Sequence, residues 1–137
     1  MQSEGNYSFE RLTVWQDAME LVERVYQVTK SFPKDELYGI TNQIRRAVVS
    51  IPVNIAEGRG RYHKKEQVQF FYNARGSLYE VITFLKISVK LGYVSDDQAI
   101  QLQEWCQRVL GKLSGLINSL KKPSPSPSTL DPSPVSP

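Results

Sequence analysis

The chain has 137 residues, of which 40% are hydrophobic and 23% are charged, with a formal net charge of +3. This balance is typical of one soluble globular domain and excludes a wholly disordered chain. No apolar run approaches the roughly 18–20 residues of a membrane span, and the N-terminus lacks the basic and apolar regions of a signal peptide. Because Cys106 is the only cysteine, no intramolecular disulfide can form, and we expect a cytoplasmic protein.

The charged residues are distributed unevenly along the chain. Residues 1–36 carry four basic and seven acidic side chains, residues 37–90 nine and three, and residues 91–137 four of each. The middle segment therefore has a net charge of +6. Such a concentration favours an anionic partner, although a basic segment that faces an acidic one within the fold is the alternative.

The first periodic segment predicts a helix over residues 13–31. Thr13 and Gln16 fit the capping-box pattern, in which each side chain bonds the backbone N–H of the other residue. Pro33 then stops the helix. Its core-facing stripe, read at three- and four-residue steps, is Trp15, Ala18, Val22, Val25, Thr29 and Phe32.

A second helix is predicted to begin between residues 35 and 41 and to end near Gly58, and a third to cover residues 64–91. The core stripe of the second is Ile44, Ala47, Val48, Ile51 and Ile55. The corresponding stripe of the third is Phe71, Ala74, Leu78, Val81 and Leu85. Gly92 follows the third helix and supplies a residue that tolerates the left-handed conformation common at helix ends.

Ser95 and Gln98 repeat the capping box and predict the start of a fourth helix, which Pro123 ends. Its apolar seam holds a seven-residue repeat: Ala99, Leu102, Cys106, Val109, Leu113, Leu116 and Leu120. Four helices with short links predict an all-α protein, an antiparallel up-down-up-down four-helix bundle.

The bundle is predicted to span residues 13–122, after an N-terminal extension at residues 1–12. The last fifteen residues contain six prolines and five serines. Because such a segment buries little apolar surface, residues 123–137 are predicted to form a disordered tail.

The second helix carries a second apolar strip, more than 90° from its core stripe, which we name the outer strip: Val49, Pro52, Val53 and Ala56. A helix packed only within a small bundle needs one apolar stripe. The outer strip therefore predicts contact with another subunit, with scattered surface apolar residues as the alternative. Gly111 and Gly115 permit close approach of another backbone and join the predicted oligomer interface, unless they serve contacts within the bundle.

Pro52 predicts a kink in the second helix, because it lacks an N–H and crowds the carbonyl group of Val48. We expect Ser50 or Asn54 to satisfy that carbonyl. Gly58 and Gly60 are expected to turn with φ > 0 and to let the chain leave the helix.

A polar ridge separates the two apolar faces of the second helix and consists of Gln43, Arg46, Ser50, Asn54, Glu57 and Arg61. Charged and amide groups at these positions can satisfy one another when they are buried. The sequence therefore predicts a structural polar network, whose members are Arg46, Ser50, Asn54, Glu57 and Arg75.

Several motifs carry a resemblance to a known family: Trp15-Gln16, Phe32-Pro33, Gln43-Ile44-Arg45-Arg46-Ala47, Ser50-Ile51-Pro52, Asn54-Ile55-Ala56-Glu57-Gly58 and Gly76-Ser77-Leu78-Tyr79-Glu80. With them, residues 9–122 closely resemble the four-helix-bundle family named for large-subunit rRNA intervening-sequence proteins. The resemblance implies a non-enzymatic homopentamer. Related members are accessory variability determinants of diversity-generating retroelements, in which a basic pentamer binds reverse transcriptase and nucleic acid. His63 departs from the pattern, because serine or threonine caps a helix better.

The sequence gives little support for catalysis. Glu57 and Glu80 could form a carboxylate pair, although a structural role with Arg46 or Arg75 is the favoured interpretation. His63 lies in a basic loop whose only nearby acidic residue is Glu66, and Cys106 falls on the seam of the fourth helix, where a small buried hydrophobe is expected. The sequence has no metal-ligand cluster, phosphate loop or Ser/His/Asp set. We therefore predict that the protein is not an enzyme and needs no cofactor or metal.

Two hypotheses for function follow. In the first, the protein binds nucleic acid, and RNA is the expected ligand. Tyr62 is expected to stack on an unpaired base, and the predicted phosphate contacts are Arg45, Arg46, Arg59, Arg61, Lys64 and Lys65. In the second, it is an oligomeric protein–protein adaptor whose basic ridge meets an acidic partner. A solvated charged loop is the structural alternative to either site. The resemblance adds a reverse transcriptase as a partner, and no membrane is involved.

Overall fold

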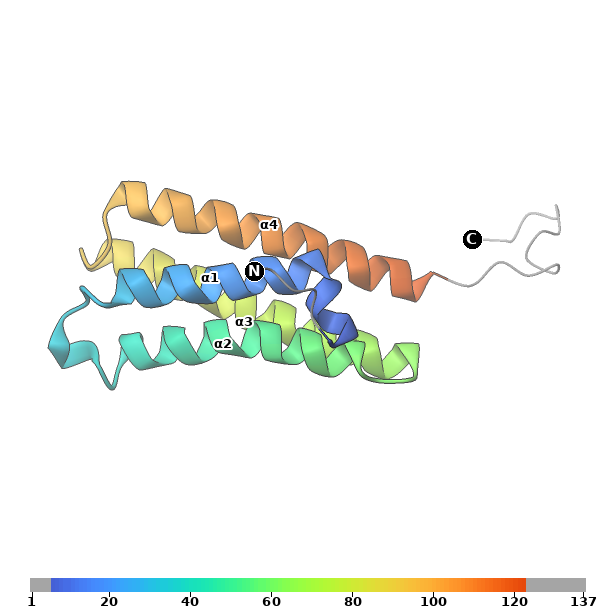
Figure 1. The fold of residues 1–137 in the computed structure, drawn as a ribbon. Helices are drawn as coiled ribbons and strands as arrows, with labels where there is room; N and C mark the ends of the chain where they lie inside the picture. The colour runs from blue at the N-terminus through green and yellow to red at the C-terminus, as the bar shows by residue number, and fades with distance from the viewer. Residues whose placement is uncertain (1–5, 123–137) are drawn as a thin grey trace, which may run out of the picture.

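The computed structural model describes residues 6–122 (Figure 1). Its elements are η1 (Ser8–Arg11), α1 (Thr13–Thr29), η2 (Lys34–Glu36), α2 (Ile40–Arg59), α3 (Lys64–Lys90) and α4 (Asp96–Lys121), where η denotes a short 3₁₀ helix. Over the described range there is no strand, so the all-α prediction is confirmed. The tail predicted to be disordered lies outside the described residues.

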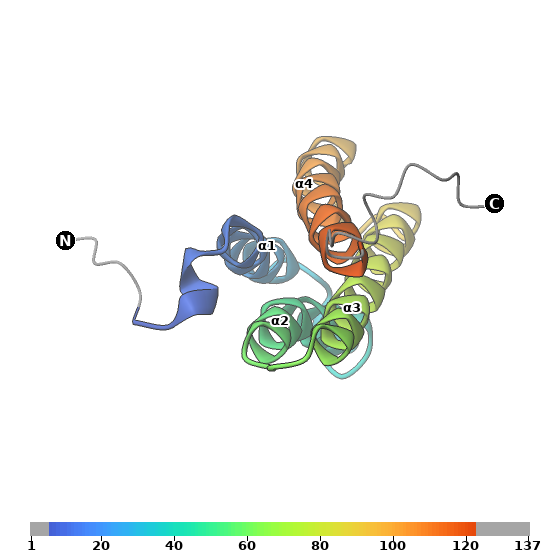
Figure 2. The ribbon, with the colours of Figure 1, turned by 90° about the vertical axis from the view of Figure 1, so that its right-hand side faces the viewer.

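Successive α-helices run in opposite directions and pack side by side (Figures 1 and 2). Both α1 and α3 contact α2 and α4, whereas α2 and α4 occupy diagonal positions and do not contact each other. This arrangement confirms the predicted up-down-up-down bundle. It also means that α2 and α4 run parallel and that their outer faces point away from each other.

The core contains the predicted stripes of α2 and α3 in full. Every stripe residue of α2 and α3 is buried, and so are Ala99, Leu102, Cys106, Val109 and Leu113 of the predicted α4 seam. At its end the seam prediction was wrong: Ile117 is buried, whereas Leu116 and Leu120 are only partly covered.

Of the stripe predicted for α1, the residues Ala18, Val25, Thr29 and Phe32 are buried. At two positions the prediction was wrong by one residue: Val14 and Leu21 are buried, whereas Trp15 and Val22 are only partly covered. Trp15 instead packs at the rim, where its ring meets that of Phe9 from η1 at 5.2 Å between centroids.

The two predicted capping boxes have different outcomes. At the start of α4, the Ser95 hydroxyl accepts from the Gln98 N–H and the Gln98 side chain accepts from the Ser95 N–H, both at 3.2 Å. At the start of α1 the prediction was wrong, because η1 occupies the space before Thr13. The Gln16 amide donates to the Glu10 carbonyl oxygen at 2.8 Å and ties η1 to α1 instead.

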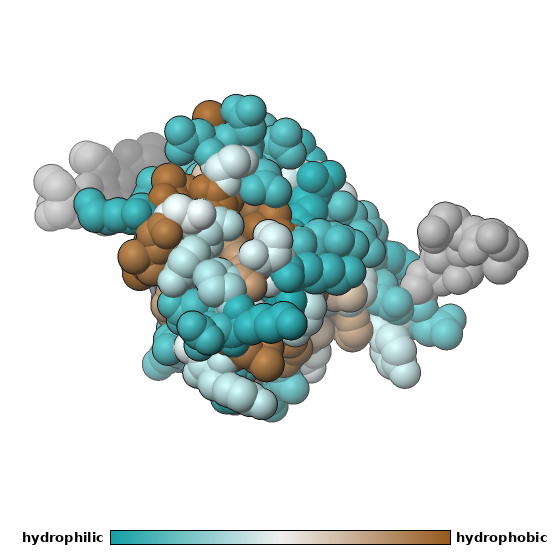
Figure 3. Space-filling model, turned by 90° about the vertical axis from the view of Figure 1, so that its left-hand side faces the viewer, coloured by the Kyte–Doolittle hydropathy of each residue, from teal (hydrophilic) through white to brown (hydrophobic). Residues whose placement is uncertain are grey.

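A second apolar cluster closes the end of the bundle where α1 joins α2 and α3 joins α4. It is built from Phe32, Ile40, Val94 and Ala99. The Tyr93 hydroxyl donates to the Glu36 carboxylate at 2.7 Å, and this bond raises the pKa of the tyrosine above its ordinary value. Figure 3 looks onto this end, where brown hydrophobic residues show between hydrophilic ones.

The helix α2 continues through Pro52 and ends only after Gly58. Gly58 is helical, Gly60 has a φ of −81°, and Gly92 alone among the described glycines has a positive φ, of 79°. The prediction of φ > 0 is therefore wrong for the first two and correct for Gly92. Gly58 serves packing: an added Cβ would lie 2.7 Å from the Phe71 ring.

Candidate nucleic-acid interface

The connection between α2 and α3 brings the predicted basic residues to one end of the bundle. Gly58 lets α3 pack closely against α2, and α2 reaches Arg59 before the chain turns. Four residues, Gly60 to His63, then reverse its direction. The Gln67 side chain donates to the Arg61 carbonyl oxygen at 2.7 Å and fixes this turn. His63 makes no side-chain capping bond, yet α3 begins directly after it.

The charges of this turn differ in how far they are neutralised. Arg61 forms an ion pair with Glu57 at 2.9 Å and its guanidinium lies 4.7 Å from the centre of the Phe70 ring. Arg59, Lys64 and Lys65 are exposed and form no hydrogen bond or ion pair with any described residue. Three cations are thus left for an outside anion.

Tyr62 stands at the tip of the same turn. Tyr62 is 89% exposed. Its ring and the His63 ring are nearly perpendicular, in a T-shaped contact with centroids 5.0 Å apart. An aromatic ring so exposed is free to stack on a planar group, which is the role predicted for it.

Sequence reasoning missed the contribution of α4 to this end. The up-down topology places the last turn of α4 beside the start of α3 (Figure 1), where Lys121 donates to the Tyr72 hydroxyl at 2.8 Å. Arg75 lies over the Tyr72 ring at 5.1 Å and donates to Ser114 at 3.2 Å. Lys122 follows, exposed. The signal was present in the sequence, because the predicted topology already implied this neighbourhood.

We name this region the basic end: Arg59, Arg61, Tyr62, Lys64, Lys65, Lys121 and Lys122.

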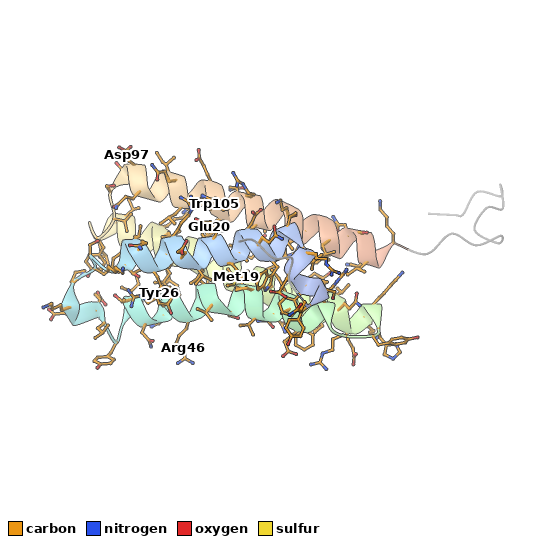
Figure 4. The ribbon with its side chains drawn as sticks, in the orientation of Figure 1. Met19, Glu20, Tyr26, Arg46, Asp97 and Trp105 are labelled. Atoms are coloured by element: carbon orange, nitrogen blue, oxygen red, sulfur yellow. The ribbon has the colours of Figure 1, made fainter. Side chains whose placement is uncertain are left out.

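Arg45 and Arg46, also predicted to contact phosphates, lie in the other half of α2. Arg45 is occupied within the fold: its Nε donates to Thr29 Oγ1 at 2.8 Å, and its guanidinium lies 4.6 Å from the centre of the Tyr26 ring. It therefore joins α2 to the end of α1. Arg46 is exposed and projects away from the bundle (Figure 4). The structure does not bring these two arginines to the basic end.

The predicted polar network is only partly formed. Asn54 donates to the carbonyl and hydroxyl oxygens of Ser50, both at 2.9 Å, and Ser50 Oγ lies 2.9 Å from Ser77 Oγ. Ser77 was missed, and Asn54 bonds Ser50 where Val48 was expected. Arg46 was wrongly included, because it is exposed rather than buried, while Glu57 pairs with Arg61 and Arg75 with Ser114. The network is thus a short link between α2 and α3.

The outer strip lines an apolar groove with a volume of about 320 Å³ between η1, α1 and α2. Phe9, Trp15, Met19 and Val22 form its other wall. Pro52 is buried by these neighbours, but Val49 and Val53 remain 37% and 53% exposed. The chain therefore covers part of the strip itself, which the sequence had not indicated.

Gly111 and Gly115 lie on the exposed side of α4. Nothing lies within 4 Å of a Cβ added at either position. They do not serve packing within the bundle, which removes one of the two interpretations of these glycines.

The chemistry of the remaining candidate residues is simple. Burial raises the pKa of the Cys106 thiol from 9.0 to about 12, so the thiol stays protonated and unreactive. Among the described residues, no three His, Cys, Asp or Glu side chains are grouped so as to hold a metal ion. No described helix is long and apolar enough to cross a membrane.

Comparison with known proteins identifies the family of this chain. The sequence profile of the 23S rRNA-intervening sequence protein family matches residues 10–115. The chain belongs to this family. A search of curated proteins finds no match.

Among solved structures, the bundle is similar to a protein of unknown function from the S23 ribosomal protein family of Bacteroides thetaiotaomicron. The TM-score is 0.72 at 18% sequence identity, and the match covers 77% of this chain and 96% of that one. At this identity the likeness supports the fold alone. The two proteins therefore share the fold over most of this chain.

Proposed function

We propose that this member of the intervening-sequence family is a non-enzymatic, homo-oligomeric accessory protein that binds RNA through its basic end. The observation that carries the proposal is the set of three exposed cations without partners, Arg59, Lys64 and Lys65, beside the exposed Tyr62 ring. Lysines in the first turn of a helix oppose the helix dipole. Their position is therefore unfavourable for folding and is better explained by an anionic ligand.

Phosphates suit this end because binding them releases condensed counterions, which supplies affinity without sequence preference. Of the four cations, Arg59 ends α2, Arg61 lies in the turn, and Lys64 and Lys65 begin α3. They therefore form a cluster and not a helix face that could enter a groove of a duplex. A stacking ring at its tip favours an unpaired base. Single-stranded or looped RNA is accordingly the proposed ligand.

Oligomerisation is supported by the apolar groove beside the outer strip. Val49 and Val53 stay exposed next to the aromatic wall of Phe9 and Trp15, and contiguous apolar surface of this kind commonly marks an interface. We propose a homopentamer, as the resemblance implies. In such a ring the basic end is repeated in every subunit, so a modest charge becomes a dense positive surface. A reverse transcriptase is the proposed protein partner.

The test of RNA binding compares two fourfold variants that change the net charge equally. One replaces Arg59, Arg61, Lys64 and Lys65 with glutamine. The control replaces Lys30, Lys34, Lys86 and Lys90, which are exposed and unpaired at the opposite end. We expect the first variant to lose RNA binding and the control to retain it, with the oligomer intact in both.

The wild-type affinity should also fall with salt, with a log–log slope of about −0.7 to −0.9 for each phosphate contact. Equal RNA affinities for the wild type and the Arg59/Arg61/Lys64/Lys65 variant at two salt concentrations would reject the RNA-binding role. The protein–protein adaptor function would then be preferred.

A further inference from the structure

The outer faces of α2 and α4 carry side chains at the same spacing. On α2 the stripe is Arg46, Ser50, Val53 and Glu57; on α4 it is Glu104, Arg108, Gly111 and Gly115. Both follow steps of four, three and four residues, which keeps four side chains in line along a helix. Apart from the half-buried Ser50, every member is exposed. If the two helices packed against each other in parallel, each residue of one stripe would lie opposite the corresponding residue of the other.

The position of these helices in the bundle makes that meeting possible between two copies. Because α2 and α4 are diagonal and run parallel, their outer faces point in opposite directions (Figures 1 and 2). Arg46 on α2 and Trp105 on α4 lie at a similar level along the bundle (Figure 4). A neighbour placed alongside in the same orientation, without sliding along the bundle, would therefore have its Glu104 region opposite Arg46.

The charges along the two stripes are complementary in this register. Arg46 and Glu80 line a polar groove of about 270 Å³ between α2 and α3, with the Ser50 and Ser77 hydroxyls at its centre. Within residues 6–122, neither Arg46, Glu80 nor Glu104 forms a hydrogen bond or ion pair. A parallel neighbour would bring its Glu104 to Arg46. It would also bring to Ser50 and Glu80 its Arg108, whose guanidinium lies 4.2 Å from the centre of the Trp105 ring of its own subunit. Opposite charges left unpaired on two faces would then be paired.

The apolar part of the register fits as well. Val53 is 53% exposed and stands opposite Gly111 of the neighbour, where a side chain finds open space. Gly115 lies one turn further along α4 and likewise leaves the helix surface without a side chain. Small residues in line let two helix backbones approach closely, so that a protruding valine can pack between them.

From these observations we infer that α4 of a second copy docks on the outer face of α2, pairing Arg46 with the partner's Glu104 and Glu80 with the partner's Arg108. The inference rests on the proposed homo-oligomer and adds its contact surface. Because each copy uses two different faces, the contact is head-to-tail, and a closed ring further requires each copy to be rotated relative to the last about an axis along the bundle.

The first experiment exchanges one predicted ion pair. We expect Arg46→Glu and Glu104→Arg each to weaken self-association about tenfold or more, because like charges then face each other. The double variant should recover most of the wild-type association. Lys90→Glu, an exposed charge reversal away from both faces, is the control and should leave the mass unchanged. Light scattering over a concentration series gives the mass, and circular dichroism checks that each variant keeps its helices.

The second experiment tests the head-to-tail geometry by mixing variants. Arg46→Glu blocks the α2 face, and Gly111→Leu blocks the α4 face. Each variant retains the face that the other lacks, so an equimolar mixture should form a dimer and no larger species.

Three outcomes would overturn the inference. If both single charge reversals keep the wild-type mass, the contact lies elsewhere and the oligomer proposal survives. If the double variant dissociates as far as the single ones, the Arg46–Glu104 pairing is wrong. If the wild type is itself a monomer, the oligomer and this contact fail together, whereas RNA binding is judged by its own assay.

Discussion

The backbone of Gly58 lies directly against the ring of Phe71, so that a Cβ at Gly58 would come within 2.7 Å of Phe71 Cε1 and 3.0 Å of Phe70 Cβ. Both aromatic residues belong to α3, the helix that follows the turn. The closeness of α2 and α3 at the basic end therefore depends on the absence of one side chain.

We expect Gly58→Ala to destabilise the protein by about 1–3 kcal/mol. The alanine gains about 1 kcal/mol of helix propensity, but the clash with a buried aromatic ring forces the two helices apart. Gly76→Ala is the matched control, because it lies in α3 with nothing within 4 Å of its Cβ, and it should stabilise by up to about 1 kcal/mol. Urea unfolding of both variants measures the difference. A stabilised Gly58→Ala would contradict the packing argument.

Arg45 and Arg59 should give opposite results when each is replaced by glutamine. Arg45→Gln removes the bond to Thr29 and the contact with Tyr26, and we expect a loss of about 1–2 kcal/mol in stability with RNA affinity unchanged. Arg59→Gln should leave the stability within about 0.5 kcal/mol and weaken RNA binding. Unfolding and RNA titration are measured for both proteins. If Arg45→Gln folds stably but binds RNA more weakly, Arg45 contacts RNA and belongs to the interface.

Tyr62→Ala should weaken the binding of single-stranded RNA by about five- to a hundredfold, the range expected when one stacked base loses its aromatic partner. Tyr62→Phe keeps the ring and should bind like the wild type. Double-stranded RNA offers no free base face, so its affinity should not change. Equal losses for single- and double-stranded RNA would show that Tyr62 does not act by stacking.

Val53→Glu should dissociate the oligomer while the helices remain, because it places a charge in the apolar part of the contact. Leu91→Glu is a matched control: both side chains are 53% exposed, but Leu91 lies at the opposite end of the bundle. Light scattering should show a lower mass for the first variant only. A mass unchanged by Val53→Glu would exclude the outer strip from the interface.

Cys106 should resist alkylation in the folded protein. Burial raises its pKa to about 12, so at pH 8 only about one thiol in ten thousand is ionised. The reaction with iodoacetamide should accelerate with rising pH and should become fast only in denaturant, where the ordinary pKa returns. Mass spectrometry follows the labelled fraction. Rapid labelling at pH 8 without denaturant would show that the α4 seam opens.

The positions of the helices were predictable from sequence because the signals are local. The stripes of α2 and α3 agree residue by residue with the buried core, and Ser95 caps α4 as the spacing indicated. Two positions of the α1 stripe were wrong by one residue, because in each pair, Val14–Trp15 and Leu21–Val22, both residues are apolar and periodicity cannot rank them. In the structure the Trp15 ring packs against Phe9 of η1 at the rim.

The candidate site was predicted in part. Arg59, Arg61, Tyr62, Lys64 and Lys65 are close in sequence, so a single turn had to bring them together. Lys121 and Lys122 reach the same end only through the bundle topology. In contrast, Arg45 and Arg46 are adjacent in sequence but point to different surroundings, since successive helical residues are about 100° apart.

The sequence by itself determined that this protein is a four-helix bundle with a basic turn between its second and third helices. Apolar periodicity, capping residues and charge composition act within a few residues, so each can be recognised without knowing the fold. Only the tertiary structure decided which charges remain free and which faces are left open. Thr29 accepts a hydrogen bond from Arg45, and η1 covers part of the outer strip. Those outcomes depend on neighbours supplied by other helices, and no local pattern encodes them.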